Sequence, residues 1–191
     1  YRFIQPKIDG VTFKKWMDSK EEMLVLDVRN DYETKIGKFK NAISLPIENF
    51  KDFPKAAEKA LKGKENEKIV MYCTGGIRCE KASSFLLQKG FKDIFQLQGG
   101  IINYFNEFPN DHYEGKCFVF DDRLSGDSGS EDVLSKCKIC KKDCDSYINC
   151  HNLECDKLFV SCQECQDDMR MACSEECKNA PRQRPTLAKP I

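Results

Sequence analysis

Nine of the twelve cysteines of this chain lie between Cys137 and Cys177, and this uneven distribution constrains the fold more than any other feature of the sequence. Disulfide-rich secreted domains seldom carry such a cluster beside a region with helix and strand patterns. The first ten residues also lack the charged and then apolar layout of a secretion signal. We therefore expect a reducing compartment, the cytoplasm, in which the clustered thiolates bind metal rather than form disulfides.

The cysteine cluster is built from short pairs, and each pair can place two thiolates on one zinc ion. The pairs are Cys137 with Cys140, Cys150 with Cys155, Cys162 with Cys165, and Cys173 with Cys177. Four pairs predict two structural zinc ions, each held by four cysteines. Either neighbouring pairs share a metal, or the first pair joins the third and the second joins the fourth, which is the arrangement we favour.

Two further residues of this segment lie close to the pairs. Cys144 stands between the first two pairs and could replace a member of either set, whereas His151 is interpreted as a solvated neighbour of Cys150 rather than a ligand. Within the segment, "LFVSC" at residues 158–162 has the pattern of a strand. We therefore expect residues 137–177 to form a small module whose stability comes largely from its metal ions.

Residues 23–113 show a different pattern, in which short apolar runs alternate with helical stretches. Residues 23–28 and 68–73 are almost continuously apolar, as in parallel strands buried on both faces, and residues 41–46 and 93–97 are shorter strand candidates. Residues 53–64 and 78–90 have helical spacing, and Gly90 is placed to end the second helix. This alternation predicts an α/β fold, with a parallel sheet flanked by helices.

Composition divides the chain into four parts. We expect a first domain over residues 1–123 with its core at about 8–113, a polar linker at 124–136, the cysteine module at 137–177, and a basic tail at 178–191 that is disordered or bound to a partner. The chain has 31 basic and 31 acidic residues, so no overall field attracts nucleic acid. The module has five basic and nine acidic residues, a formal balance of −4. Because no apolar run approaches the ~20 residues that span a bilayer, we expect no membrane contact.

The segment "YCTGGIRCEKAS" at residues 72–83 connects the end of a predicted strand to the start of a predicted helix. Gly75 and Gly76 permit the sharp turn between them. In such a connection the loop N–H groups and the helix N-terminus point toward the sulfur of Cys73, and both favour a thiolate. Cys73 is therefore the candidate nucleophile, because a purely structural cysteine would leave the paired glycines and Arg78 unexplained. Neither histidine of the chain lies in the loop, so we expect activation by the amides and by Arg78 rather than by a Cys–His pair.

Cys79 follows in the first predicted turn of the same helix. Its side chain either packs in the core or faces back toward the loop as a resolving thiol, and we favour packing. A metal site with Cys73 is disfavoured, because five residues separate the two cysteines and no second pair stands nearby.

Three ordered segments, residues 23–46, 70–83 and 94–104, resemble the successive signatures of the rhodanese (sulfurtransferase) family. The loop at 72–83, followed by "FVFDDR" at 118–123 and the cysteine-rich segment, is similar more narrowly to the transfer-RNA uridine hydroxylase branch and its eukaryotic relatives with thiosulfate sulfurtransferase-like domains. The resemblance implies that Cys73 carries a persulfide. Its cradle would be formed by Thr74, Gly75, Gly76, Ile77 and Arg78.

The resemblance assigns further residues to the surroundings of this site. Asp27 and Arg29, with Glu33, match a family motif near the mouth of the site, but we favour the structural interpretation, an acid at a strand end and a buried ion pair that fixes the loop. Gly99 and Gly100 match a double glycine that lets the chain pass close to the sheet.

The same resemblance implies an enzyme that takes sulfur from a sulfane donor such as thiosulfate or a persulfide. Four residues separate Cys73 from Arg78, one fewer than in the related cysteine-dependent phosphatases, and a shorter loop suits a sulfur atom better than a phosphate. Bacterial members of the narrower branch hydroxylate the wobble uridine of tRNA at position 5, which implies tRNA as a partner. The alternative is a binding module, in which the zinc module docks a protein partner and the rhodanese fold has little activity.

Overall fold

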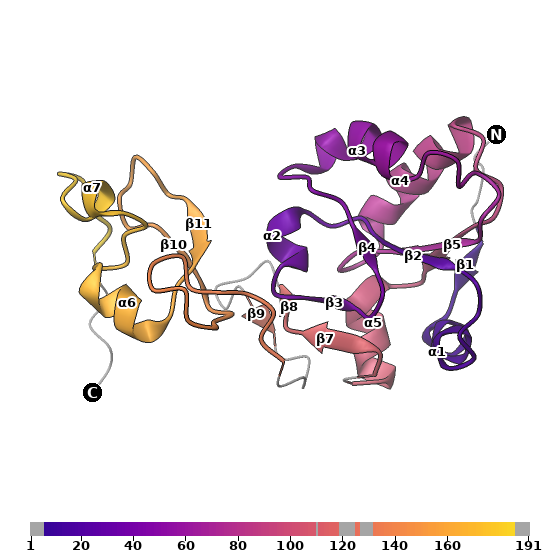
Figure 1. Cartoon of the computed structure of the whole chain (residues 1–191), viewed down its shortest axis with the longest axis horizontal. Coiled ribbons are helices and arrows are strands. Elements are labelled where there is room, and N and C mark those ends of the chain that lie inside the picture. Colours follow the sequence, from indigo (N-terminus) through magenta and orange to yellow (C-terminus); the bar gives the residue numbers. More distant parts are fainter. Residues whose placement is uncertain (1–5, 110, 119–124, 127–131, 186–191) are drawn as a thin grey trace. The chain divides into compact units, whose positions relative to one another are not determined.

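The computed structural model describes residues 6–109, 111–118, 125–126 and 132–185. The chain divides into two compact units (Figure 1). The first, here called the sheet unit, comprises residues 1–119 and 126–132, and the second, the cysteine unit, comprises residues 120–125 and 133–191. Residues 124 and 127–131 of the predicted linker, and most of the segment 118–123, fall outside the described residues, so the linker stays a prediction.

The sheet unit is built on a five-stranded parallel sheet with the strand order β1-β6-β5-β2-β4. In that order the strands are Lys7–Ile8, Ile94–Leu97, Ile69–Tyr72, Leu24–Asp27 and Ile43–Ser44. The four strands expected from the sequence are confirmed. The edge strand β1 was not expected, because two residues are too short a run to give a periodic pattern.

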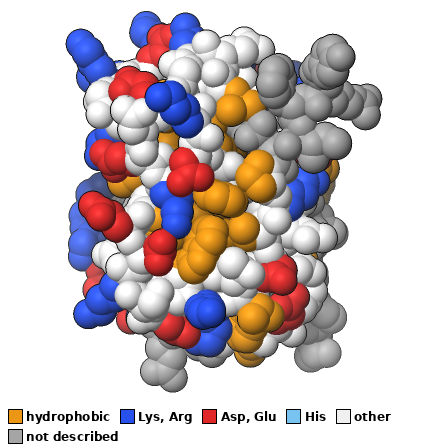
Figure 2. All heavy atoms as spheres, turned by 90° about the vertical axis from the view of Figure 1, so that its right-hand side faces the viewer, with side chains coloured by type: hydrophobic (Ala, Val, Ile, Leu, Met, Phe, Trp, Pro, Cys, Tyr) orange, Lys and Arg blue, Asp and Glu red, His pale blue; other side chains and the backbone are white. Residues whose placement is uncertain are grey.

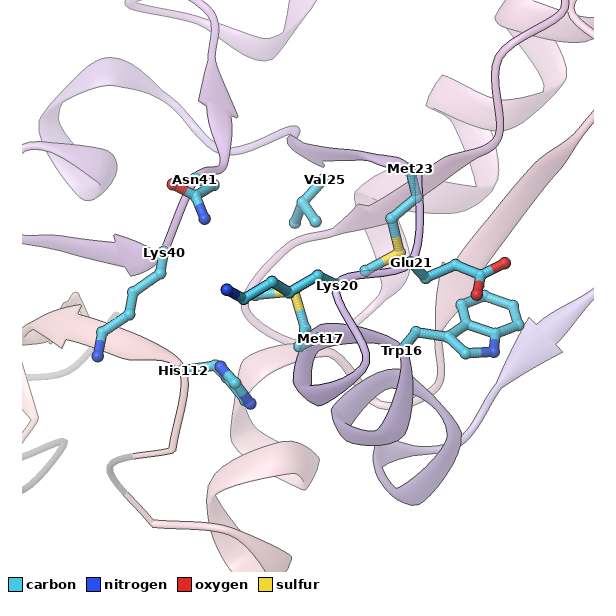
Figure 3. A pocket seen from close by; sticks show the side chains of 9 residues that line it. All are labelled: Trp16, Met17, Lys20, Glu21, Met23, Val25, Lys40, Asn41 and His112. Carbon is cyan, nitrogen blue, oxygen red and sulfur yellow. The ribbon is translucent and has the colours of Figure 1, made fainter.

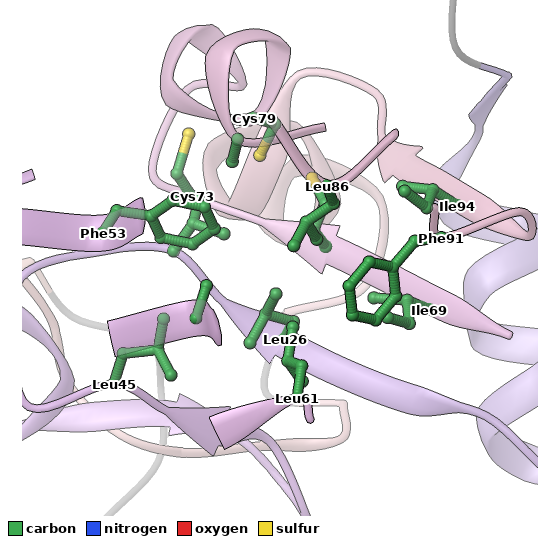
Figure 4. Packing of buried hydrophobic residues seen from close by; sticks show 14 of the residues in the cluster. Leu26, Leu45, Phe53, Leu61, Ile69, Cys73, Cys79, Leu86, Phe91 and Ile94 are labelled. Atoms are coloured by element: carbon green, nitrogen blue, oxygen red, sulfur yellow. The ribbon is translucent and has the colours of Figure 1, made fainter. Parts of the chain in front are cut away.

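Helices cover both faces of this sheet. Helices α3 (Phe53–Ala60) and α4 (Ile77–Gln88) pack on one face, where the buried side chains of β2 and β5 are Leu26, Ile69 and Met71 (Figure 4). Helices α1 (Gly10–Asp18) and α5 (Gly100–Glu107) pack on the other face, against Val25, Val70 and Tyr72. Alternate residues of a strand point to opposite faces of the sheet. A strand in which nearly every residue is apolar can therefore be buried on both faces. The predicted α/β fold is confirmed.

Shorter elements complete the sheet unit. These are α2 (Asp31–Thr34), the 3₁₀ turn η1 (Phe50–Asp52), β3 (Gly37–Phe39) paired antiparallel with β7 (Tyr113–Gly115), and β8 (Cys117–Phe118), followed by β9 (Ser125–Gly126). Helix α1 was missed by the sequence analysis, although Asp9 caps it by accepting a hydrogen bond from the Thr12 N–H at 2.7 Å. Within the described part of the chain, no helix is both long and apolar enough to span a membrane.

The cysteine unit contains little regular structure. Strands β10 (Tyr147–Asn149) and β11 (Leu158–Val160) form an antiparallel pair, and the short helices α6 (Gln163–Asp168) and α7 (Glu175–Lys178) follow. The sequence predicted the second strand but not the first, whose burial pattern is mostly intermediate. A small cluster of Cys150, Phe159, Ala172 and Cys173 forms part of its buried core.

The basic tail differs from the prediction over its described part. The backbone of residues 182–184 pairs with the turn at 151–153, through hydrogen bonds from Leu153 N to Arg182 O (3.0 Å) and from Arg184 N to His151 O (2.7 Å). The expectation of a disordered or partner-bound tail is therefore wrong for residues 178–185. The prolines permit this pairing because the residues between them supply the N–H and carbonyl groups that it uses. Residues 186–191 lie outside the described part.

Candidate active site and candidate metal centres

The Cys73 loop connects the end of β5 to the N-terminus of α4. Gly76 precedes the helix with φ of +91°, a left-handed conformation that favours glycine, and its N–H donates a hydrogen bond to Cys73 Sγ at 3.0 Å. The Arg78 and Cys79 N–H groups follow in the first turn of α4. The sulfur therefore occupies the position of an anion at a helix N-terminus, as the sequence predicted.

Helix α5 supports this loop from the other side. Its Ile101 and Ile102 N–H groups donate to the carbonyl oxygens of Cys73 and Thr74 at 3.0 and 3.2 Å. Gly100 has φ of +64°, and a Cβ atom there would lie 2.3 Å from the Cys73 carbonyl oxygen. The double glycine was expected to let the chain pass close to the sheet, whereas the backbone that Gly100 approaches is that of the Cys73 loop, just after β5 ends.

The environment of Cys73 stabilises the thiolate and lowers the pKa of its thiol to about 5. The largest cause is a hydrogen bond from the Cys79 side chain. Burial opposes this effect, whereas the Arg78 N–H, the positive charge of Arg78 and the Cys79 N–H all act to lower the pKa. The sequence analysis expected the amides and Arg78 to contribute, but it missed the contribution of the Cys79 thiol.

Cys79 is fully buried in the same hydrophobic cluster as Cys73, which is 2% exposed (Figure 4). Its hydrogen bond to Cys73, then burial, then the negative charge on Cys73 raise the pKa of the Cys79 thiol well above its usual value. Cys79 therefore packs in the core, the alternative favoured from the sequence, and a resolving role for its thiol stays untested.

Arg78 is held by Glu33 of α2. Its guanidinium makes two hydrogen bonds to the carboxylate, at 2.5 Å to Oε2 and 2.8 Å to Oε1, and the Thr74 hydroxyl donates to the same carboxylate at 3.2 Å. Glu33 is fully buried, and its side chain also accepts from the N–H of Asn30 in a capping box at the start of α2. Helix α2 thus fixes the orientation of Arg78 beside the Cys73 loop.

Asp27 and Arg29 form a fully buried ion pair at the end of β2, with Arg29 Nη2 2.7 Å from Asp27 Oδ2. The Tyr72 hydroxyl donates to the same carboxylate at 2.6 Å, and Arg29 donates to the Gly37 carbonyl oxygen at 2.7 Å. Neither side chain of the pair is exposed for contact with a substrate. This geometry supports the structural interpretation of the "DVR" motif, in which the pair holds strand ends and loops together.

The cysteine unit brings together two sets of four thiols in the crossed arrangement. The sulfur atoms of each set lie within 4.8 Å of one another. The sets are Cys137, Cys140, Cys162 and Cys165, and Cys150, Cys155, Cys173 and Cys177. Cys144 belongs to neither set, and neither does His151.

The spacing of these sulfur atoms fits a tetrahedral metal site. The Cys140–Cys162 sulfur distance is 3.6 Å, and the Cys173 sulfur lies 3.7 Å from that of Cys155 and 3.8 Å from that of Cys177. A tetrahedron of sulfur atoms around a zinc ion at ~2.3 Å has edges of ~3.8 Å, whereas a disulfide requires an S–S distance of ~2.05 Å. These two clusters of four cysteines could each bind a metal ion.

A separate pocket of 380 Å³, which the sequence analysis missed, lies beside α1 (Figure 3). Its apolar wall includes Trp16, Met23 and Val25, and Lys20 and Lys40 reach its edge. Figure 2 shows hydrophobic side chains gathered on one face of the sheet unit among charged ones. The pocket lies near the amino end of β2, whereas Cys73 follows the carboxyl end of the parallel strand β5, so the pocket is no part of the Cys73 site.

Comparisons with known proteins agree with this geometry. Residues 11–107 match the family model of the rhodanese-like domain, and residues 114–178 match a model described as rhodanase C-terminal. A protein of Chlamydia felis named tRNA uridine(34) hydroxylase is 48% identical over 177 residues, which are 88% of this chain and 54% of that protein. A protein of Cytophaga hutchinsonii with the same name is 46% identical over 175 residues, 90% of this chain and 55% of that protein. The chain spans about half the length of these curated relatives.

Among solved structures, the rhodanese-like domain of the Alr3790 protein from Anabaena sp. superposes with a TM-score of 0.50 at 22% sequence identity. The match covers 70% of this chain and 94% of that domain, and it supports the fold of the sheet unit. The family model covers four of the five strands of the sheet, all except β1, together with the helices on its faces and the Cys73 loop. This chain therefore belongs to the rhodanese-like domain family.

Proposed function

We propose that Cys73 is a nucleophile that accepts sulfane sulfur as a persulfide, within a protein that modifies uridine 34 of tRNA. The observation that carries this proposal is the nearly buried Cys73 sulfur at the N-terminus of α4, where hydrogen bonds lower the pKa of its thiol to about 5. A cysteine in this environment is a thiolate at neutral pH and is therefore reactive. The names of the relatives support tRNA as the substrate of the whole protein.

With thiosulfate as donor, the proposed step needs no proton transfer. The Cys73 thiolate attacks the outer sulfur of thiosulfate, a new S–S bond forms, and the S–S bond of thiosulfate breaks with sulfite leaving with the electron pair. The negative charge moves to the outer sulfur of the persulfide. In this proposal the inner sulfur keeps the hydrogen bond from the Gly76 N–H. The N-terminus of α4 then stabilises the negative charge on the outer sulfur.

We further propose that each four-cysteine set of the cysteine unit holds a zinc ion. The sulfur distances of 3.6 to 3.8 Å support this assignment. A zinc ion with four thiolate ligands has no open coordination position, so its role here is to stabilise the unit rather than to act on a substrate. Because the ligands of the second set belong to the small buried cluster or pack against it, the metal ions would supply most of the stability of the unit.

A tRNA partner would have to contact the sheet unit rather than the cysteine unit. The cysteine segment has a formal balance of −4, and four thiolates around each divalent ion make it more negative. In the tail, Arg182 and Arg184 lie 3.8 and 2.5 Å from the carboxylates of Glu154 and Asp156, so their charges are partly compensated. A tRNA substrate and twelve free cysteines both fit a cytoplasmic protein.

Mass spectrometry after incubation with thiosulfate tests the proposed function. We expect one added sulfur atom per chain, mapped to the peptide that contains Cys73 and removed by a thiol reductant. Cys73→Ser protein should gain no sulfur, whereas Cys117→Ser, which alters a buried cysteine of the other core cluster, should behave as wild type. An adduct that persists in the Cys73→Ser protein would refute the assignment.

A further inference from the structure

The pocket beside α1 is a cavity that the proposed function does not use. It lies at the amino end of β2, whereas Cys73 follows the carboxyl end of β5, and its volume of 380 Å³ falls in the range of roughly 300 to 1,000 Å³ that is typical of small-ligand sites. Two of its apolar lining residues, Met17 and Met23, are only partly buried by the surrounding core, and so is Trp16. Together with the buried side chain of Val25 they give the pocket an apolar wall (Figure 3).

Three other residues that line the pocket have an uncommon backbone conformation. Lys20, Asn41 and His112 have φ of +52°, +63° and +55°, and in the described part of the sheet unit they are the only residues other than glycine with a positive φ. Lys20 follows the end of α1, where its N–H donates to the Met17 carbonyl oxygen at 3.2 Å, and glycine is the usual residue at such a position. Strained residues of this kind concentrate at ligand sites, so their convergence on one pocket points to binding.

The positive charge of the pocket is not balanced by its own acidic groups. Among the described lining residues Glu21 alone is acidic, and its carboxylate lies 2.7 Å from the ammonium group of Lys68. Lys20 and Lys40 are exposed at the edge of the pocket, and neither forms an ion pair with a described residue (Figure 3). The edge therefore attracts an anionic group, whereas the wall behind it favours an apolar one.

We infer that this pocket binds a small planar aromatic molecule that carries one anionic group, a carboxylate or a sulfonate. The aromatic part packs against Trp16 and against the thioethers of Met17 and Met23, because sulfur atoms and aromatic rings contact one another favourably. The anionic group lies near the ammonium groups of Lys20 and Lys40. The inference is independent of the proposed function.

Energy transfer from Trp16, the only tryptophan of the chain, tests this inference. The whole chain is titrated with anilinonaphthalene sulfonate, an aromatic anion that accepts energy from tryptophan, and separately with phenylnaphthylamine, which has the same rings without the sulfonate. We expect saturable energy transfer to the sulfonate probe, since the pocket lies directly beside the indole. Absence of energy transfer from Trp16 would place any bound probe elsewhere and would overturn the inference.

A double variant separates recognition of the charge from apolar binding. Lys20→Gly combined with Lys40→Ala removes both cations, and it should fold because glycine suits the positive φ at position 20. An exposed ion pair contributes up to about fivefold in affinity, so the dissociation constant of the sulfonate probe should rise about tenfold. That of phenylnaphthylamine should change by less than about twofold, because it has no charge to lose a partner. An unchanged ratio of the two dissociation constants would overturn the inference.

Two single variants serve as controls for this comparison. Lys15→Ala removes an exposed lysine of α1 that does not line the pocket, so both probes should bind as they do to the wild type. Met23→Ala shortens the apolar wall, so it should weaken both probes by a similar factor. Full affinity of both probes for the Met23→Ala protein would show that they bind outside the pocket.

Discussion

The sheet unit and the cysteine unit both depend on thiolates, but they stabilise them in opposite ways. In the sheet unit, the Cys73 sulfur accepts a hydrogen bond from the Gly76 N–H, and its fixed protein surroundings lower the pKa of the thiol to about 5. In the cysteine unit, burial and hydrogen bonding to three neighbouring thiols raise the pKa of Cys173 to about 12, whereas donors from Asn152 and Ser174 lower that of Cys177 to about 6. Four thiols that crowd together cannot all ionise without a cation.

This difference indicates two roles for the same side chain. A thiolate stabilised by fixed protein donors keeps a free lone pair and can react, whereas thiolates that need a metal ion donate their lone pairs to it. The units also differ in their hydrophobic cores. The sheet unit contains clusters of fifteen and twelve buried residues, whereas several of the buried residues of the cysteine unit, such as Cys137, Cys150 and Cys173, are themselves candidate metal ligands, so we expect metal to matter for stability in the second unit alone.

Removal of metal should give the largest difference in folding between the two units. Treatment with a strong chelator under reducing conditions is expected to unfold the cysteine unit, since structural zinc contributes on the order of 10 kcal/mol to small modules. The sheet unit should remain folded, and thiosulfate should still load Cys73. Limited proteolysis with mass spectrometry would locate the cleavage, and elemental analysis before treatment should give about two zinc ions per chain. Metal-free protein with residues 137–177 still resistant to protease would contradict this account.

A substitution at Gly100 should destabilise the sheet unit and distort the Cys73 loop. Gly100→Ala places a Cβ atom 2.3 Å from the Cys73 carbonyl oxygen at a positive φ, so we expect a loss of about 2 kcal/mol or more in the free energy of unfolding. Gly75→Ala is the matched control in the same site, because a Cβ there meets nothing within 4 Å. Urea denaturation would measure both. Equal stability of the two variants would show that the close approach of α5 is not needed.

Substitution of the two ion-paired arginines of the tail should give the smallest changes in stability and in tRNA affinity. Arg184 is partly exposed, and its ion pair with Asp156 should contribute at most about 1 kcal/mol to stability. We expect Arg184→Ala to change the affinity for labelled tRNA by less than about threefold at moderate salt, because tRNA contact falls on the sheet unit. Fluorescence anisotropy at two salt concentrations tests this, with Arg182→Ala as a parallel variant. A large loss of affinity in either variant would place the RNA surface on the cysteine unit.

The sequence predicted the features that depend on local pattern. Apolar runs located β2 and β5, and the order of residues in "YCTGGIRC" identified the turn and the reactive cysteine, because strand ends and helix starts have characteristic residues. It did not predict β1 or the backbone pairing of the tail, which depend on partners distant in the chain. Helix α1 was missed although its capping residue Asp9 is a local signal. The effect of Cys79 on the pKa of Cys73 was missed because the orientation of a side chain in the first helical turn is set by packing.

The most direct test of the contrast between the units measures all cysteines of the untreated protein in one experiment. Brief alkylation across a pH series, followed by peptide mapping, gives the reaction rate of each cysteine. Since the pKa of Cys73 is lowered to about 5, its thiolate persists above that pH and is lost as the pH falls through it. We predict that at pH 6 Cys73 reacts faster than any cysteine of the two four-cysteine sets and that its rate falls by half near pH 5. A Cys73 rate that rises only near pH 8 to 9, as for an ordinary thiol, would contradict the account.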